Sequence, residues 1–193
     1  MDQMLNVYRL IKVPRRWVHV VQCWSDDTAD KLLEYFPKPI SVDYNGRRAS
    51  ANEFRTFVTR AKTPELAELF SNFDTPEARA YFTDLSGVDC SQGKLRIELC
   101  QDGPGFWLEN HIDIPEKLIT LQVYLGDGKH SWGTELFWET GQITVPFEHN
   151  SGWLGNKHNK IIHGVPKKTV DGIRKSVIIN YVVGDWNDKE QLY

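Results

Sequence analysis

The chain has 193 residues, of which 40% are hydrophobic and 12% aromatic. A sequence of this length and composition folds around a real core and is not intrinsically disordered. Its 23 basic and 26 acidic residues give a net charge of −3, and the basic residues cluster only in pairs. We therefore expect no polyanion-binding surface and no nucleic-acid partner. No apolar stretch is long enough to predict a membrane span.

The cysteines predict neither a disulfide framework nor a thiolate zinc site. Cys23, Cys90 and Cys100 form no CxxC pair and leave an odd count. The N-terminal segment is interrupted by basic residues, at Arg9, Lys12, Arg15 and Arg16. It therefore lacks the apolar run of a signal peptide, and we expect a cytoplasmic protein.

Helix signals dominate the first half of the chain, after a predicted strand at 17–21. The cluster 25–27 is a good N-cap for an amphipathic helix over 29–36, which Pro37 should stop. Thr63-Pro64-Glu65 and Thr75-Pro76-Glu77 each open a further helix: threonine can cap, proline fits the first turn, and glutamate favours the positive end of the helix dipole.

The second half of the chain carries β signals. Alternating or apolar runs predict strands at 95–99, 106–112, 119–125, 134–138, 143–147, 160–163 and 175–183. Turn residues separate them, at 102–105, 126–128, 140–141 and 151–152. Short strands at this spacing predict a β-sandwich or jelly roll with the helices packed outside one sheet. We expect one domain over 1–193, with a helical support region at 1–89 and a β core at 90–186.

Two histidines and an aspartate form a candidate metal site. His111 and Asp113 are two residues apart near the end of a predicted strand, so their side chains can enter the same cavity. His163 lies at the end of the apolar run 161–162, whereas most other histidines lie among loop residues. Two imidazoles and one carboxylate form the facial triad that binds Fe(II) and leaves coordination positions open.

Arg174 and Ser176 extend this pattern towards an acidic co-substrate. They share one face at the start of the strand 175–183, so the arginine is expected inside the β core. A buried guanidinium is costly without an anion, and the carboxylate of a small molecule could supply it.

The sequence resembles the 2-oxoglutarate- and Fe(II)-dependent oxygenase superfamily, whose signature is HxD, a distal histidine and an arginine about ten residues later. The stretches 105–113, 118–125, 162–165 and 174–182 are similar to small bacterial members related to the prolyl hydroxylases. The resemblance covers roughly residues 90 to 190.

This resemblance implies a double-stranded β-helix of the cupin-like jelly-roll type. It implies that His111, Asp113 and His163 bind Fe(II), and that Arg174 with Ser176 holds the distal carboxylate of 2-oxoglutarate. Tyr124 lies where prolyl-hydroxylase-like members place a tyrosine that reaches the same carboxylate, although a core aromatic is an equally good interpretation. With O2 as second co-substrate, such an enzyme releases succinate and CO2, and the carboxylate of Asp113 favours hydroxylation over halogenation.

The substrate cannot be deduced from the sequence. A small metabolite or an exposed side chain is expected, because a compact chain leaves little room for a docking domain. Two other classes stay open: a cupin-like, metal-containing binding module, and a zinc-dependent isomerase or hydrolase without O2 chemistry. The isomerase or hydrolase would have no use for the pair Arg174 and Ser176.

Overall fold

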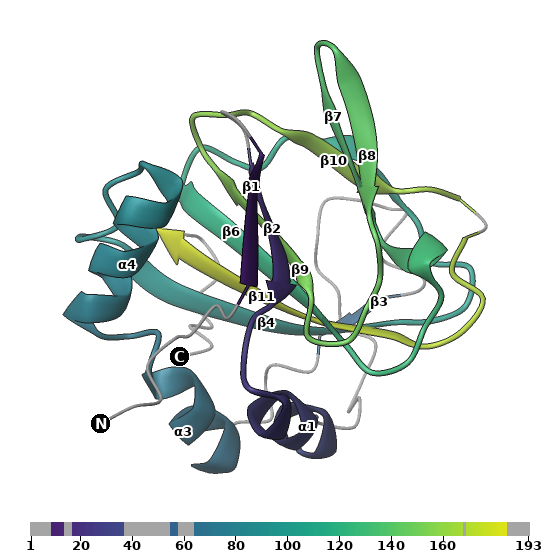
Figure 1. Cartoon of the computed structure of the whole chain (residues 1–193), viewed down its shortest axis with the longest axis horizontal. Helices are drawn as coiled ribbons and strands as arrows, with labels where there is room; N and C mark the ends of the chain where they lie inside the picture. The colour runs from purple at the N-terminus through teal and green to yellow at the C-terminus, as the bar shows by residue number, and fades with distance from the viewer. Residues whose placement is uncertain (1–8, 14–16, 37–54, 58–63, 168, 185–193) are drawn as a thin grey trace.

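The computed structural model describes residues 9–13, 17–36, 55–57, 64–167 and 169–184. The protein is mainly β, with strands in two sheets and a few helices at one side (Figure 1). The larger sheet contains, in spatial order, β1 (Arg9–Val13), β2 (Trp17–Gln22), β9 (Gly152–Asn156), β6 (Lys117–Leu125), β11 (Arg174–Val182), β4 (Lys94–Asp102) and β3 (Arg55–Phe57). The smaller sheet contains β5 (Leu108–His111), β10 (Ile162–Val165), β7 (Thr134–Trp138) and β8 (Gly141–Val145).

From β4 onward the chain passes back and forth between the two sheets. The strands β4, β6, β9 and β11 belong to the larger sheet, and β5, β7, β8 and β10 to the smaller one. Their facing sides share one buried cluster, in which Tyr124 and Trp153 of the larger sheet meet Leu136 and Val165 of the smaller. The site described below lies between these two faces.

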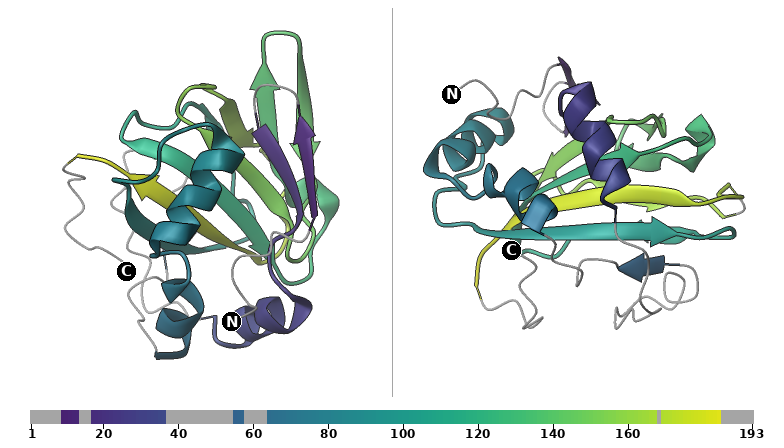
Figure 2. Two further views of the ribbon diagram at one scale, coloured as in Figure 1. Left: turned by 60° about the vertical axis from the view of Figure 1, so that its left-hand side comes forward. Right: turned by 90° about the horizontal axis from the view of Figure 1, so that it is seen from below.

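Among the described residues, three helices cover the outer face of the larger sheet: α1 (Asp26–Glu34), α3 (Pro64–Ser71) and α4 (Pro76–Ser86). Figure 2 shows α4 lying across this face. A second apolar cluster joins Leu32, Phe70 and Phe82 of the helices to Ile97 and Ile179 of the sheet. Alternation along each strand explains the division, since odd-numbered residues of β4 and β11 face the helices and even-numbered ones face the site.

The predicted helix starts are confirmed where the structure describes them. The Ser25 side chain accepts a hydrogen bond from the Thr28 backbone N–H, and Thr75 does the same for Ala78, with Pro76 in the first turn. Thr63 and Pro37 lie outside the described residues. Local capping residues therefore determine where the helices begin, and packing of their apolar faces on the sheet stabilises them.

Strand β9 corrects the prediction of a turn at residues 151–152. The turn lies just before it, where Asn150 adopts a left-handed conformation with φ of 62°. Gly152 is already the first residue of the strand, and a Cβ there would lie 1.8 Å from the Gln122 carbonyl oxygen. Glycine permits this close approach of β9 to β6. Because glycine is more typical of turns than of strands, the sequence did not predict β9.

The other predicted strands are present with shifted ends. The alternating runs at 95–99 and 119–125 lie within β4 and β6, and 134–138 is β7. The segment before residue 90 supplies β1, β2 and β3 to the larger sheet as well as the helices, and β2 contains the strand predicted at 17–21. No helix among the described residues is both long and apolar enough to cross a membrane.

Candidate active site

The three predicted metal ligands lie together between the sheets. Each of His111, Asp113 and His163 offers a ligand atom within 4.8 Å of those of the other two. His111 ends β5 and is directly opposite His163 on β10, with the two ring centroids 4.1 Å apart. Asp113 lies two residues beyond the end of β5, so the loop that leaves the strand, and not the strand itself, carries the carboxylate.

Backbone carbonyls fix the tautomer of both imidazoles. The Nδ1 of His111 is 2.9 Å from the carbonyl oxygen of Glu109, and the Nδ1 of His163 is 3.1 Å from that of Ile161. A carbonyl can only accept, so Nδ1 donates in both rings and each Nε2 keeps a lone pair. The ring of Trp153, with its centroid 4.9 Å away, also packs against His163.

The Asp113 carboxylate is held at both oxygens. The Lys117 ammonium donates to Oδ1 at 2.9 Å and the Thr120 hydroxyl to Oδ2 at 2.8 Å. Burial raises the pKa of the Asp113 carboxyl, but the charge of Lys117, the electrostatic effect of the nearby His163 ring and the two hydrogen bonds lower it more, so the pKa falls well below its usual value. The carboxylate is therefore ionised and oriented, as a metal ligand must be.

Lys117 remains charged beside it. Burial lowers the pKa of the lysine, but the carboxylates of Asp113 and Glu98 outweigh this effect and the pKa lies above its usual value. The lysine side chain is only 15% exposed, so its ion pair with Asp113 is shielded from solvent.

A buried asparagine extends the support of the carboxylate. The Thr120 hydroxyl oxygen also lies 2.9 Å from Asn180 Oδ1, but its single proton is given to Asp113. The Asn180 Nδ2 atom has no hydrogen-bond partner among the described residues. If the amide is turned by about 180°, Nδ2 donates to the Thr120 hydroxyl oxygen. This supplies the missing proton between the two side chains and gives Nδ2 a partner. We therefore infer a chain of hydrogen bonds from Asn180 through Thr120 to Asp113.

Arg174 lies inside the core at the opposite end of the site, and its side chain is fully buried. Its Nη1 donates to Asp102 Oδ2 at 2.6 Å, its Nε to the carbonyl oxygen of Trp132 at 2.7 Å and its Nη2 to the Thr134 hydroxyl at 3.4 Å. The arginine is thus inside the β core, as predicted. Asp102, expected in a turn, is instead the last residue of β4 and pairs with it across the strands.

Aromatic rings enclose this guanidinium. Its central carbon is 5.1 Å from the ring centroid of Tyr124, 5.9 Å from that of Phe106 and 6.0 Å from that of Phe147. Burial raises the pKa of Tyr124 more than the arginine lowers it, so the phenol is neutral at pH 7. Cation–π contacts in such a dry setting stabilise the charge and fix its position.

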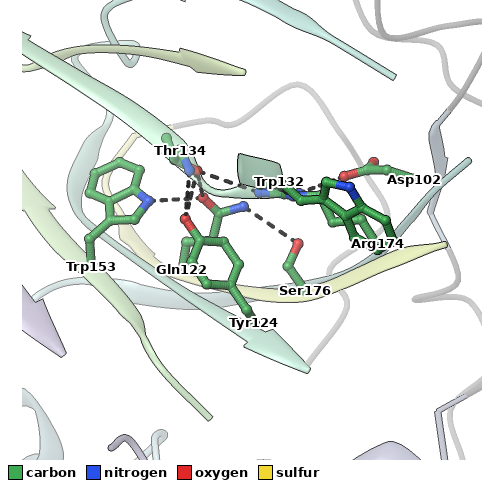
Figure 3. Close-up of polar contacts among 8 residues, drawn as sticks. All are labelled: Asp102, Gln122, Tyr124, Trp132, Thr134, Trp153, Arg174 and Ser176. Carbon is green, nitrogen blue, oxygen red and sulfur yellow. Dashed lines mark hydrogen bonds and ion pairs between the residues drawn. The ribbon is translucent and has the colours of Figure 1, made fainter. Parts of the chain in front are cut away.

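A polar network joins the arginine to the centre of the site (Figure 3). Thr134 accepts from the Tyr124 hydroxyl at 2.8 Å and donates to Gln122 Oε1 at 3.0 Å. Trp153 Nε1 donates to the same Gln122 oxygen at 2.9 Å, and Gln122 Nε2 lies 3.4 Å from the Ser176 hydroxyl. Thr134 and Gln122 thus link Arg174, Tyr124 and Ser176 in one network.

Several residues that support the site were not found from the sequence: Asp102, Lys117, Thr120, Gln122 and Thr134. Lys117 follows Asp113 by only four residues, and this short spacing is a local signal that points to their pairing. Thr120, Gln122 and Tyr124 follow one another at intervals of two residues along β6. This spacing places all three side chains on one face of the strand. Asp102 and Arg174 are 72 residues apart, so only the strand register reveals their pairing.

Several solved structures share this architecture. The chain is similar to a prolyl 4-hydroxylase from Pseudomonas putida, with a TM-score of 0.61 and 14% identity over 88% of each chain. HygX from Streptomyces hygroscopicus, solved with nickel, 2-oxoglutarate and hygromycin B, gives a TM-score of 0.59 and 13% identity over 86% of this chain and 82% of its own.

A third similar structure is a Trichoplax adhaerens prolyl hydroxylase in complex with a hypoxia-inducible-factor peptide. It has a TM-score of 0.52 and 12% identity over 81% of this chain and 75% of its own. The chain shares the fold of these three proteins. The sequence itself matches no protein-family model and no curated protein.

Proposed function

We propose that the protein is a 2-oxoglutarate- and Fe(II)-dependent dioxygenase on a double-stranded β-helix. The alternation of strands β4 to β11 between two facing sheets supports that fold. The observation that carries the function is the ligand set: two imidazoles with Nδ1 tied to carbonyls, and one oriented carboxylate, converge within 4.8 Å. This donor set suits Fe(II) and leaves open positions for co-substrates.

His111, Asp113 and His163 would hold the iron, each through one atom. When bound, iron and 2-oxoglutarate couple the oxidative decarboxylation of the oxoacid, which releases succinate and CO2, to oxidation of a substrate C–H bond by O2. The protein's part is to orient these groups. The carbonyl contacts prevent either imidazole from turning, and Lys117 with Thr120 prevents Asp113 from rotating.

Arg174 and Ser176 would hold the distal carboxylate of 2-oxoglutarate. The guanidinium has five N–H donors, and its three bonds to protein atoms leave donors available for a ligand oxygen. Tyr124 would contribute the face of its ring, because its hydroxyl proton is engaged by Thr134. The enclosing aromatic side chains exclude water and so strengthen the contact between arginine and carboxylate.

The substrate would be a small metabolite or an exposed side chain. The two kinds are represented among proteins of similar fold, by HygX with bound hygromycin B and by the Trichoplax adhaerens enzyme with a bound peptide. We further propose that residues 1–193 form one oxygenase domain, since β1, β2 and β3 complete the sheet that carries the site. The cytoplasm is the proposed compartment, where iron is readily kept ferrous.

Uncoupled turnover tests this proposal without knowledge of the substrate. Purified protein with Fe(II), ascorbate and 2-oxoglutarate is expected to consume O2 and form succinate in equal amounts, and Asp113→Ala is expected to abolish both. A metal-loaded protein that makes no succinate under these conditions would count against an oxygenase. The same result would favour a binding module or a hydrolytic metal site.

A further inference from the structure

Two internal ion pairs occupy the two ends of the proposed site. Lys117 pairs with the metal ligand Asp113 at 2.9 Å, and Asp102 pairs with the co-substrate anchor Arg174 at 2.6 Å. The second pair is fully buried, and the side chains of the first are 15% and 25% exposed. Each group proposed to attract a charged ligand thus already has an opposite charge from the protein beside it.

The charges of a further ion pair on β4 also cancel. Arg96 pairs with Glu98 at 2.7 Å, and these side chains are 13% and 11% exposed. Glu98 acts on Lys117 as well, since its charge helps to raise the pKa of the lysine. Arg96 and Glu98 together therefore add no net charge near the site.

Neutral groups separate the two ends. Gln122 lies between them. Its amide contacts Ser176 on the arginine side. On the same face of β6, two residues before Gln122, Thr120 contacts Asp113 on the metal side. Among the described residues, the site without ligands therefore has one ion pair at each end, and the charges of these two pairs cancel.

We propose that these two ion pairs set the charge of the site to zero, so that a divalent metal and the 2-oxoglutarate dianion neutralise each other and neither is attracted strongly alone. The inference rests on the proposed function. A metal ion bound alone leaves a charge of about +2 between the sheets, and bound 2-oxoglutarate brings the total back to zero. Lys117 weakens the site for metal and strengthens it for the dianion, and Asp102 does the reverse.

Two substitutions should therefore give opposite patterns. Lys117→Met removes a cation beside a metal ligand, so the protein should bind metal about fivefold or more tightly, and the metal-loaded protein should bind 2-oxoglutarate more weakly by a similar factor. Asp102→Asn removes an anion beside the anchor. The metal should then bind more weakly and 2-oxoglutarate more tightly, again by about fivefold.

This crossed pattern distinguishes a role in charge balance from a role in holding shape. If Lys117 serves only to orient Asp113, its loss loosens a ligand and metal binding falls. If Asp102 serves only to orient Arg174, its loss weakens 2-oxoglutarate binding. The charge-balance proposal predicts the opposite sign in each of these two measurements.

The experiment uses Mn(II) as the metal, because it binds the same oxygen and nitrogen ligands and is stable in air. Free Mn(II) is titrated by electron paramagnetic resonance with wild type and both variants. Binding of 2-oxoglutarate to the Mn(II)-loaded proteins is then measured by calorimetry. Lys117→Arg, which keeps the charge, should stay near wild type in both measurements.

Lys31→Met is the matched control. Lys31 forms an ion pair with Asp27 at the same four-residue spacing and at 2.8 Å, but on the exposed surface of α1. It should change neither affinity. Circular dichroism confirms folding of each variant, and if Asp102→Asn does not fold, the Lys117→Met arm still decides the sign.

The outcomes separate the two proposals. Wild-type protein that binds neither Mn(II) nor 2-oxoglutarate would overturn the proposed function. Wild-type protein that binds both, with Lys117→Met weakening metal binding or leaving it unchanged, would overturn the charge-balance proposal alone.

Discussion

The two ends of the proposed site, the metal end with His111, Asp113 and His163 and the arginine end with Arg174, differ in how they are built. The metal end is half open: His111 and Asp113 are partly exposed, and two of its three ligands come from one short stretch of chain. The arginine end is sealed, with Arg174 and Asp102 both fully buried and joined across two strands. We therefore expect ligands to reach the site from the first end, and the second end to contribute more to the stability of the fold.

The largest expected effect concerns stability at the arginine end. Arg174→Met removes the guanidinium that is paired with the buried Asp102 carboxylate and should lower the free energy of unfolding by about 3–5 kcal/mol. The double variant Arg174→Met with Asp102→Leu should recover most of that loss, because no buried charge remains. Urea denaturation measures both, and a double variant no more stable than the single one would contradict this account.

At the metal end, removal of a ligand should change binding far more than folding. His163→Ala leaves two ligands and should weaken Mn(II) binding by more than about a hundredfold, beyond the usual effect of losing a supporting residue. The unfolding midpoint without metal should move much less than for Arg174→Met. Equal destabilisation by the two substitutions would remove the distinction between the ends.

A supporting residue should show an intermediate effect. Thr120→Val keeps the shape of the side chain but removes the hydrogen bond to Asp113, so Mn(II) affinity should fall about tenfold. Thr144→Val, on the exposed strand β8, is the matched control and should bind metal normally. If both valine variants bind Mn(II) as wild type does, the threonine does not orient the carboxylate.

The smallest effect is a dependence of stability on pH. The pKa of Asp113 is lower in the folded protein than in the unfolded chain, so the unfolded state binds more protons as the pH falls. The carboxylate therefore contributes stability above pH of about 4, which is lost on acidification below that value. Asp113→Asn should make the metal-free protein less sensitive to acid over this range, as acid titrations of unfolding would show. An unchanged acid limb would place the sensitivity in other carboxylates.

The metal end could be predicted from the sequence because its ligands lie in short local motifs. His111 and Asp113 are two residues apart, and His163 ends an apolar run in a region of β signals. Strand alternation predicted that Arg174 and Ser176 lie on one face, inside the β core. Both side chains are fully buried. Periodicity alone was enough in these places.

The rest depends on long-range pairing. Asp102 was expected in a turn because it precedes Gly103 and Pro104, and its true role appears only when β4 lies beside β11. The strand β9 was missed because glycines flank its Trp153 and Leu154, and its close contact with β6 is a tertiary requirement. Register between distant strands is not encoded in any local pattern.

The most direct test of the central claim is optical. Under anaerobic conditions, Fe(II) and 2-oxoglutarate added together should give the wild-type protein a weak visible charge-transfer band that neither gives alone, and His163→Ala should show none. Wild-type protein that binds iron but gives no band when 2-oxoglutarate is added would contradict the account.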